Sequence, residues 1–167
     1  MANDHPQSEH PQPERPQSES GSTAFLLAQV GAYAAEEFGS LLAPLKLTPA
    51  DAGILRFLRQ SPGISQQKLA GALGMHASRL VALIDGLEKR GLVVREANAD
   101  DRRVYSLRLT GAGAEMLQSI RQAARSHNER LCASLSAEER LLLTSLLRRI
   151  AAVHGLIPGI HPGYKAL

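Results

Sequence analysis

Hydrophobic residues recur at intervals of three and four along most of this chain, which is the spacing of one face of an α-helix. The pattern predicts one long helix over residues 23–45 and two further long helices over residues 111–154. Thr48 and Ser136 are each followed, three residues later, by an acidic residue. This arrangement caps the first turn of a helix, so we expect a mainly helical chain in which helices begin at these two residues.

Two short helices with a tight turn between them are predicted in the middle of the chain. Ser65 can cap the first helix, and Gly74 lies where a left-handed residue would end it. The second helix ends at Gly91 and buries an i, i+3, i+4, i+7 set, namely Leu80, Leu83, Ile84 and Leu87. Helices joined by so short a turn must cross steeply, as in helix-turn-helix motifs.

After Gly91 the period of the pattern changes. Residues 92–95 and 104–109 are short runs rich in β-branched and aromatic residues, with partial alternation of apolar and polar side chains. The intervening residues 96–103 contain Asn and Asp, which suit a turn, and their arginines would project from its tip. The pattern predicts a winged helix-turn-helix: a mainly α fold with a small β-hairpin wing.

These residues resemble the MarR family of bacterial transcriptional regulators. The family's wing carries Asp-x-Arg, followed by Leu-Thr six and seven residues later, and this chain has Asp101-Arg102-Arg103 and then Leu109-Thr110. The family's recognition helix ends in a Leu-Glu-Lys-Arg-Gly-Leu-Val type of sequence, which Leu87–Val93 matches. The resemblance covers residues 25–153. It implies a ligand-responsive repressor that binds a pseudo-palindromic operator as a homodimer.

The resemblance also implies a division of the chain. A MarR-like domain is expected over residues 22–155, with the winged helix-turn-helix at about 48–110 and dimerisation helices at about 23–45 and 111–154. The last helix supports dimerisation, because its leucines form a stripe wider than one neighbouring helix can cover. The alternative is a helical bundle within one chain.

The two ends of the chain have a different composition. Three Pro-Gln-rich pentads occupy residues 5–19, and such a segment cannot bury enough apolar area to offset its ordering entropy. Residues 1–21 are therefore predicted to be a disordered tail, with a functional arm as the alternative. Residues 156–167 contain prolines and glycines and are predicted to be a C-terminal tail.

The wing supplies the first candidates for DNA binding. The resemblance implies that Arg103 enters the minor groove, where positive side chains are favoured, and Asp101 would orient it by a charge-assisted hydrogen bond. Arg102 is expected close to phosphate. The alternative for Arg103 is a solvated loop arginine.

The outer face of the recognition helix supplies further candidates. Arg79 can contact guanine in a bidentate manner, whereas the family often has Thr and Arg where this chain has Val81 and Ala82. Helix capping is the alternative role of His76 and Ser78. The predicted DNA-binding set is Ser65, Gln66, His76, Ala77, Ser78, Arg79, Ala82, Lys89, Asp101, Arg102 and Arg103.

An effector site is implied by the resemblance as well. In the family, a small acidic ligand, often aromatic or phenolic, binds between the dimer helices and the winged lobe. The candidate lining residues are Tyr33, Phe38, Arg56, Phe57 and His127. Packing of the core explains the aromatic residues equally well.

Composition and charge limit the other function classes. The net charge is +3, but residues 1–21 carry −3, so the remainder carries +6, a basic bias consistent with phosphate binding. The chain has no run of about 18 apolar residues, so no transmembrane helix is predicted. Its first residues are polar, so no signal peptide is predicted either. We therefore expect a cytoplasmic protein.

The remaining chemistry-bearing residues predict neither a cofactor nor catalysis. The single Cys132 is expected to be buried and inert, with a redox switch as the alternative. His127, His154 and His161 lack metal-ligand spacing, and no catalytic motif is present. We expect no metal, no cofactor and no enzyme. The rival is a winged-helix module that binds a protein partner instead of DNA, although a basic wing favours DNA.

Overall fold

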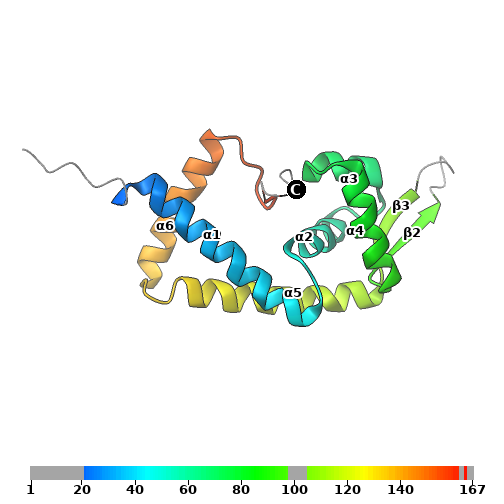
Figure 1. Ribbon diagram of the computed structural model, residues 1–167, viewed down its shortest axis with the longest axis horizontal. Helices are drawn as coiled ribbons and strands as arrows, with labels where there is room; N and C mark the ends of the chain where they lie inside the picture. The colour runs from blue at the N-terminus through cyan, green and yellow to red at the C-terminus, as the bar shows by residue number, and fades with distance from the viewer. Residues whose placement is uncertain (1–20, 98–104, 162–163, 165–167) are drawn as a thin grey trace, which may run out of the picture. The chain divides into compact units, whose positions relative to one another are not determined.

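The computed structural model describes residues 21–97, 105–161 and 164. The chain divides into two compact units, residues 1–33 and 34–167. The elements follow one another along the chain (Figure 1) as α1 (Thr23–Leu42), η2 (Ala43–Leu45), α2 (Pro49–Gln60), β1 (Ile64–Ser65), α3 (Gln66–Leu73), α4 (Ala77–Lys89), β2 (Val93–Ala97), β3 (Tyr105–Leu109), α5 (Gly111–Leu131) and α6 (Ala137–Val153).

Polar side chains begin the helices where the sequence predicts. Thr48 and Asp51 form a capping box at α2, and Ser136 and Glu139 form one at α6. The hydroxyl of Thr110 accepts a hydrogen bond from the Gly113 amide at the start of α5 (3.0 Å). Such bonds satisfy amide groups that have no partner inside the helix.

The first long helix ends earlier than predicted, at Leu42. Pro44 lies in the short 3-10 helix η2 that follows, and Lys46 has a left-handed backbone with φ of 54°. A proline cannot donate a helical hydrogen bond, and its ring clashes with the carbonyl four residues earlier. The α-helix therefore cannot continue to Leu45.

The sheet has three antiparallel strands in the order β1-β3-β2. The predicted hairpin is confirmed, with Val93 opposite Leu109 and Ala97 opposite Tyr105. The strand β1 is an addition, because Ile64 pairs with Leu107. Two residues are too short a run for a periodic pattern, so this strand was missed in the sequence.

One hydrophobic core joins α2, the helix-turn-helix and the sheet. Leu80, Ile84 and Leu87 are buried as predicted, whereas Leu83 is only half-buried. The largest fully buried side chains are Leu42, Ile54, Leu55, Leu58, Leu69, Leu73, Leu80, Ile84, Leu87, Val93 and Leu107. In Figure 1, α3 and α4 lie beside the β2–β3 hairpin that this core supports.

Part of the C-terminal segment packs onto this core. Ile160 contacts the core, and Tyr164 is buried with its hydroxyl donating to the Pro49 carbonyl (3.0 Å). Gly53 of α2 makes room for this side chain, because a Cβ there would overlap the Tyr164 ring and hydroxyl. The prolines and glycines of this segment predict a tail, and that prediction missed two side chains, Ile160 and Tyr164, that pack on the core.

Cys132 is not buried as predicted. It is half-exposed in this chain and lies at the C-cap of α5, where its amide donates to the carbonyl of Asn128. The helix ends at this residue, so no further turn covers the thiol.

α6 contrasts with the core helices, because none of its residues is buried. Its exposed large apolar side chains are Leu141, Leu142, Leu143, Leu146, Leu147, Ile150 and Val153. Across the described part of the chain, no helix is long and apolar enough to cross a membrane.

Candidate nucleic-acid interface

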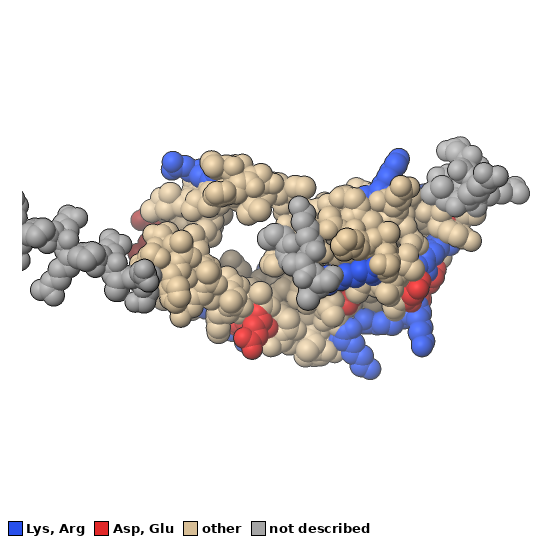
Figure 2. Space-filling view, turned by 45° about the horizontal axis from the view of Figure 1, so that its top comes forward, with Lys and Arg blue, Asp and Glu red and all other residues tan. Residues whose placement is uncertain are grey.

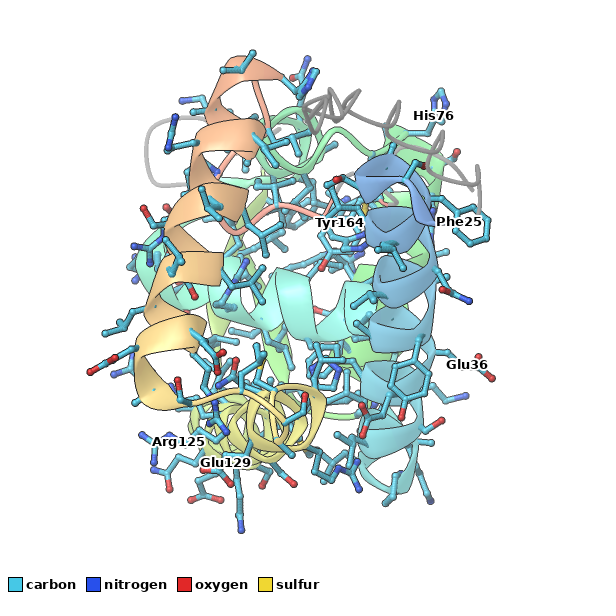
Figure 3. All side chains as sticks on the ribbon, turned by 90° about the vertical axis from the view of Figure 1, so that its left-hand side faces the viewer. Phe25, Glu36, His76, Arg125, Glu129 and Tyr164 are labelled. Carbon is cyan, nitrogen blue, oxygen red and sulfur yellow. The ribbon has the colours of Figure 1, made fainter. Side chains whose placement is uncertain are left out.

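The outer face of α4 is open along its whole length. Ser78, Ala82 and Lys89 lie on this face, opposite the buried Leu80 and Ile84. His76 is the N-cap residue, but its side chain makes no capping hydrogen bond. In Figure 3 its ring points outward, away from the neighbouring elements. Capping therefore does not account for the His76 side chain.

Ala77 is also exposed, but Arg79 differs from its predicted place. Its side chain is half-buried, because helical phase places it on the flank of α4 and not at the centre of the outer face. It also has an interaction within the protein. The contact of Arg79 with guanine stays a prediction.

Ser65 and Gln66, at the start of α3, have partners inside the protein. The Ser65 hydroxyl caps α3 by accepting from the Lys68 amide (3.3 Å). The Gln66 side-chain oxygen accepts from Nε of Arg95 (2.7 Å). Both side chains thus help to position the helix-turn-helix, and their contact with DNA stays a prediction.

Arg95 connects three elements and was missed in the sequence. From β2 it donates to Asp85 and Glu88 of α4 and to Gln66 of α3, and its side chain is only 16% exposed. Burial alone would lower the pKa of Arg95, but hydrogen bonds and charges from Asp85 and Glu88 outweigh burial and raise it. The guanidinium stays charged and holds α4 against the wing strand.

Two acidic residues of α4 could have indicated from the sequence that Arg95 has a structural role. Asp85 and Glu88 are three residues apart on a helix whose outer face should otherwise approach phosphates. Two carboxylates there would repel phosphate, which favours a cation nearby, and the strand that follows supplies Arg95.

Lys89 and Arg90 at the end of α4 have different roles. Lys89 is exposed. The Arg90 guanidinium donates to the carbonyls of Lys46 (2.6 Å) and Leu45 (2.9 Å), so it ties the end of α4 to η2. A contact within the protein therefore accounts for the Arg90 side chain.

The wing is described at its base. Its two strands stay paired as far as Ala97 and Tyr105, and Arg108 forms an ion pair with Glu96 across them (2.9 Å). The predicted DNA-binding residues Asp101, Arg102 and Arg103 lie outside the described residues.

Charged side chains gather around the winged helix. On the face drawn in Figure 2, most of the visible Lys and Arg side chains lie over this part of the molecule, with Asp and Glu side chains among them. The surface is thus mixed in charge, and Arg95 and Arg108 already neutralise three of its carboxylates.

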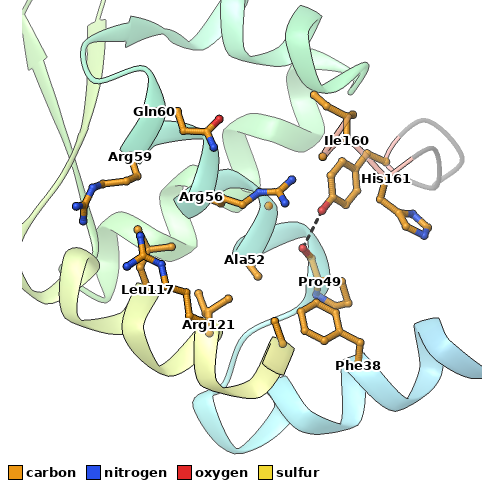
Figure 4. A pocket seen from close by; sticks show the side chains of 15 residues that line it. Phe38, Pro49, Ala52, Arg56, Arg59, Gln60, Leu117, Arg121, Ile160 and His161 are labelled. Atoms are coloured by element: carbon orange, nitrogen blue, oxygen red, sulfur yellow. Dashed lines mark hydrogen bonds between the residues drawn. The ribbon is translucent and has the colours of Figure 1, made fainter. Parts of the chain in front are cut away.

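A cavity of about 530 Å³ lies beside α2, within the second unit. Its walls are mostly apolar, and polar side chains of α2, α5 and the C-terminal segment reach it (Figure 4). Its lining includes Phe38, Ala52, Arg56, Arg59, Gln60, Leu117, Ile120, Arg121, Ile160, His161 and Tyr164.

Two of the five predicted effector-site residues, Phe38 and Arg56, line this cavity. Phe57 is half-buried against the core and is not part of the lining, because its position on α2 turns it to another side. His127 does not line the cavity either. Its ring lies 5.5 Å from that of Phe38.

The other predicted side chain, Tyr33, belongs to the first unit, where it is exposed. His127 has an acidic neighbour, because its Nε2 lies 3.6 Å from a Glu37 oxygen, and Arg130 binds the other oxygen of that carboxylate (2.8 Å). Within the described residues no group of three or more His, Cys, Asp or Glu side chains could hold a metal ion.

The sequence missed the cavity residues that come from far along the chain. Arg121 of α5 and His161 and Tyr164 of the C-terminal segment join Arg56 and Arg59 of α2. Only the packing of these three segments brings the residues together. The three arginines add positive charge to a lining that is otherwise mostly apolar.

Comparison with known proteins agrees with this architecture. The profile described as MarR family matches residues 45–104. A transcriptional regulatory protein for the hcr operon of Thauera aromatica is 38% identical over 104 residues, which are 62% of this chain and 63% of that protein. The chain therefore spans less than two thirds of that relative.

Solved structures match over a longer stretch. The transcriptional repressor CouR, bound to a 23-mer DNA duplex, is 33% identical with a TM-score of 0.71, over 81% of this chain and 99% of that one. MarR from E. coli complexed with operator DNA is 26% identical with a TM-score of 0.66, over 76% of this chain and 91% of that one. The helix order, the three-stranded sheet and these matches show that the chain belongs to the MarR family of winged-helix transcriptional regulators.

Proposed function

We propose that this chain is a sequence-specific repressor that binds a pseudo-palindromic operator as a homodimer and responds to a small acidic effector. The observation that carries the proposal is the open outer face of α4, held on a buried Leu80–Ile84–Leu87 stripe in the same fold as repressors solved on DNA. In this fold the second helix of the motif enters the major groove.

α4 and the wing divide the contacts with DNA. The outer face of α4, with Ser78 and Ala82, is suited to base edges in the major groove, and Lys89 is suited to phosphate. Arg79 remains our candidate for guanine, because a guanidinium can bind O6 and N7 together. Arg103 is proposed to enter the minor groove from the wing, oriented by Asp101, with Arg102 near phosphate.

Dimerisation is proposed through the terminal helices, over residues 23–45 and 111–154. Leu141 is 73% exposed and Val153 is 84% exposed in the single chain. An apolar surface as continuous as that of α6 is rare on monomers and marks a protein contact. A second copy of the chain covers it and gives the twofold symmetry that a palindromic operator requires.

The cavity beside α2 is the proposed effector site. Its apolar lining suits an aromatic ring, and Arg56 and Arg121, which also line it, suit a carboxylate. α2 packs against β3 and α5, so a ligand there can shift the winged lobe relative to the dimer helices. The chain would act in the cytoplasm by binding, without catalysis and without a cofactor.

The test is binding to DNA selected from a random library by the purified protein. We expect tight, salt-dependent binding to one palindromic sequence and much weaker binding to unrelated DNA. Arg103→Ala should weaken binding by about 1–3 kcal/mol and reduce any preference for A·T pairs under the wing.

A matched control keeps this test specific. Arg108→Ala removes a cation at the base of the same wing, where Arg108 is paired with Glu96, and should change affinity much less than Arg103→Ala. If no sequence is enriched and affinity for all DNA is negligible, the rival function as a protein-binding module replaces this one.

A further inference from the structure

We propose that Val81 determines part of the operator sequence by contacting the C5-methyl group of a thymine in the major groove. This inference rests on the proposed DNA binding and adds a base preference to it. Val81 was not among the residues expected to bind DNA.

The hydrophobic core does not use the side chain of Val81. Its side chain is 40% exposed, although it is a large apolar residue, while the adjacent Leu80 is 1% exposed. Valine also has a lower helix propensity than alanine or the long unbranched side chains, because its branched Cβ loses rotamer freedom. Neither core packing nor helix stability therefore favours valine at this place.

Val81 lies on the flank of α4 opposite to Arg79, and its exposed side chain borders the outer face that carries Ser78. Ser78 and Asp85 lie three residues before and four residues after it, so all three share one side of the helix. Ala77 and Ala82, which are also exposed, are too short to cover the Val81 side chain. A base pair that approaches this side of α4 meets the two methyl groups of Val81.

The acidic neighbour on the same side is already engaged. The Asp85 carboxylate binds the guanidinium of Arg95, which also binds Glu88. Asp85 is thus neutralised and is drawn toward β2, so it does not compete with Val81 for the base. The interaction that Val81 can make is apolar.

Groove chemistry then restricts the choice of base. Guanine, cytosine and adenine present hydrogen-bond donors and acceptors in the major groove, whereas thymine also presents a methyl group. A valine cannot satisfy a donor or acceptor, and leaving one buried without a partner is costly. Thymine is the base that gains from contact with Val81.

Deoxyuridine provides the test, because uracil keeps the hydrogen-bonding pattern of thymine and lacks only the methyl group. The operator selected from the random library is synthesised with uracil in place of thymine, one symmetric pair of positions at a time. We expect one such pair to weaken binding by the wild-type dimer about fourfold for each of the two methyl groups removed, which is the scale of one buried methyl group.

Val81→Ala completes the comparison. This variant should fold as the wild type does, because it shortens an exposed side chain, and thermal unfolding checks this. On the thymine operator it should bind more weakly than the wild type, and on the uracil operator the two proteins should bind alike. Replacement of thymines outside the half-sites is the control and should change neither protein.

The outcomes separate the inference from the function on which it rests. If the wild-type protein binds no selected DNA, the proposed function itself fails. If it binds but no uracil replacement weakens binding, Val81 does not read thymine. If a replacement weakens binding by both proteins equally, another residue reads that methyl group and the assignment to Val81 is wrong.

Discussion

Arg95 and Arg108 lie on neighbouring strands of the wing and form ion pairs of very different kinds. The Arg95 side chain is 16% exposed and has acidic partners at two positions of α4, whereas Arg108 and Glu96 are each about half-exposed. Water screens an exposed pair and competes for its hydrogen bonds, so such a pair contributes little to stability. Because the Arg95 guanidinium is largely shielded from water, its ion pairs contribute more to stability than the Arg108–Glu96 pair.

Arg95→Gln is therefore expected to lower the free energy of unfolding by about 1–2 kcal/mol, since it removes the hydrogen bonds that the shielded guanidinium makes to Asp85, Glu88 and Gln66. Urea denaturation followed by circular dichroism measures the change. Arg108→Gln is the matched control and should alter stability by less than about 0.5 kcal/mol. Equal effects of the two variants would show that the Arg95 network is no more than a surface pair.

Tyr164 provides a second prediction at this scale. Burial raises the pKa of its phenol above the usual 10.0, and the charge of Arg56 opposes this only in part. The folded protein thus favours the neutral phenol. The stability that this group contributes is fully present below pH 10 and is lost as the pH rises through the folded-state pKa.

Tyr164→Phe tests this pH dependence of the stability. The variant loses the hydrogen bond to Pro49 and should be less stable than the wild type by about 1 kcal/mol at pH 7. That difference should shrink as the pH rises above 10, and the late-ionising tyrosine should disappear from the ultraviolet absorbance titration. A difference that stays constant with pH would mean that Tyr164 is not buried in solution.

Among the elements, two helical glycines show opposite constraints. A Cβ at Gly86 in α4 would meet nothing within 4 Å, whereas a Cβ at Gly113 would overlap the Leu92 carbonyl, where the first turn of α5 meets the wing. Thr110 strengthens the same junction by donating to the Gly91 carbonyl (2.6 Å). The first glycine is a conformational cost to its helix, and the second is required by packing.

Gly86→Ala should accordingly stabilise the protein by about 0.5–1 kcal/mol, because alanine loses less backbone entropy in a helix. Gly113→Ala should destabilise it by more than about 1 kcal/mol, because the new methyl group displaces α5 from the wing. Thermal unfolding of both variants measures the two effects. If both substitutions changed the stability in the same direction, α5 would not pack closely against the Leu92 carbonyl.

At the scale of the whole molecule, the exposed leucines of α6 lead to the prediction of a dimer. α6 presents its leucines without a single buried residue. Leu146→Glu should give a monomer at micromolar concentration in sedimentation, because a lone carboxylate is costly to bury in an apolar interface. Glu138→Gln, an exposed change at the start of the same helix, should leave the dimer intact. A monomeric wild type would contradict the proposed dimer.

Features set by neighbouring residues could be predicted from the sequence. Thr48, Ser65, Thr110 and Ser136 cap their helices because each hydroxyl reaches an amide only three residues away. The stripe of Leu80, Ile84 and Leu87 and the wing strands follow from periods of 3.6 and 2 residues. These interactions need no knowledge of the rest of the fold.

Features that join distant residues were decided only by the tertiary structure. Arg95 binds Gln66, which is 29 residues away, and Tyr164 binds Pro49, which is 115 residues away. The strand β1 exists only because β3 lies beside it. No local period or spacing encodes such partners, since they depend on how the segments pack. The sequence by itself determined the winged helix, its caps and the family. Packing decided which arginines hold the helix-turn-helix together and which residues line the cavity.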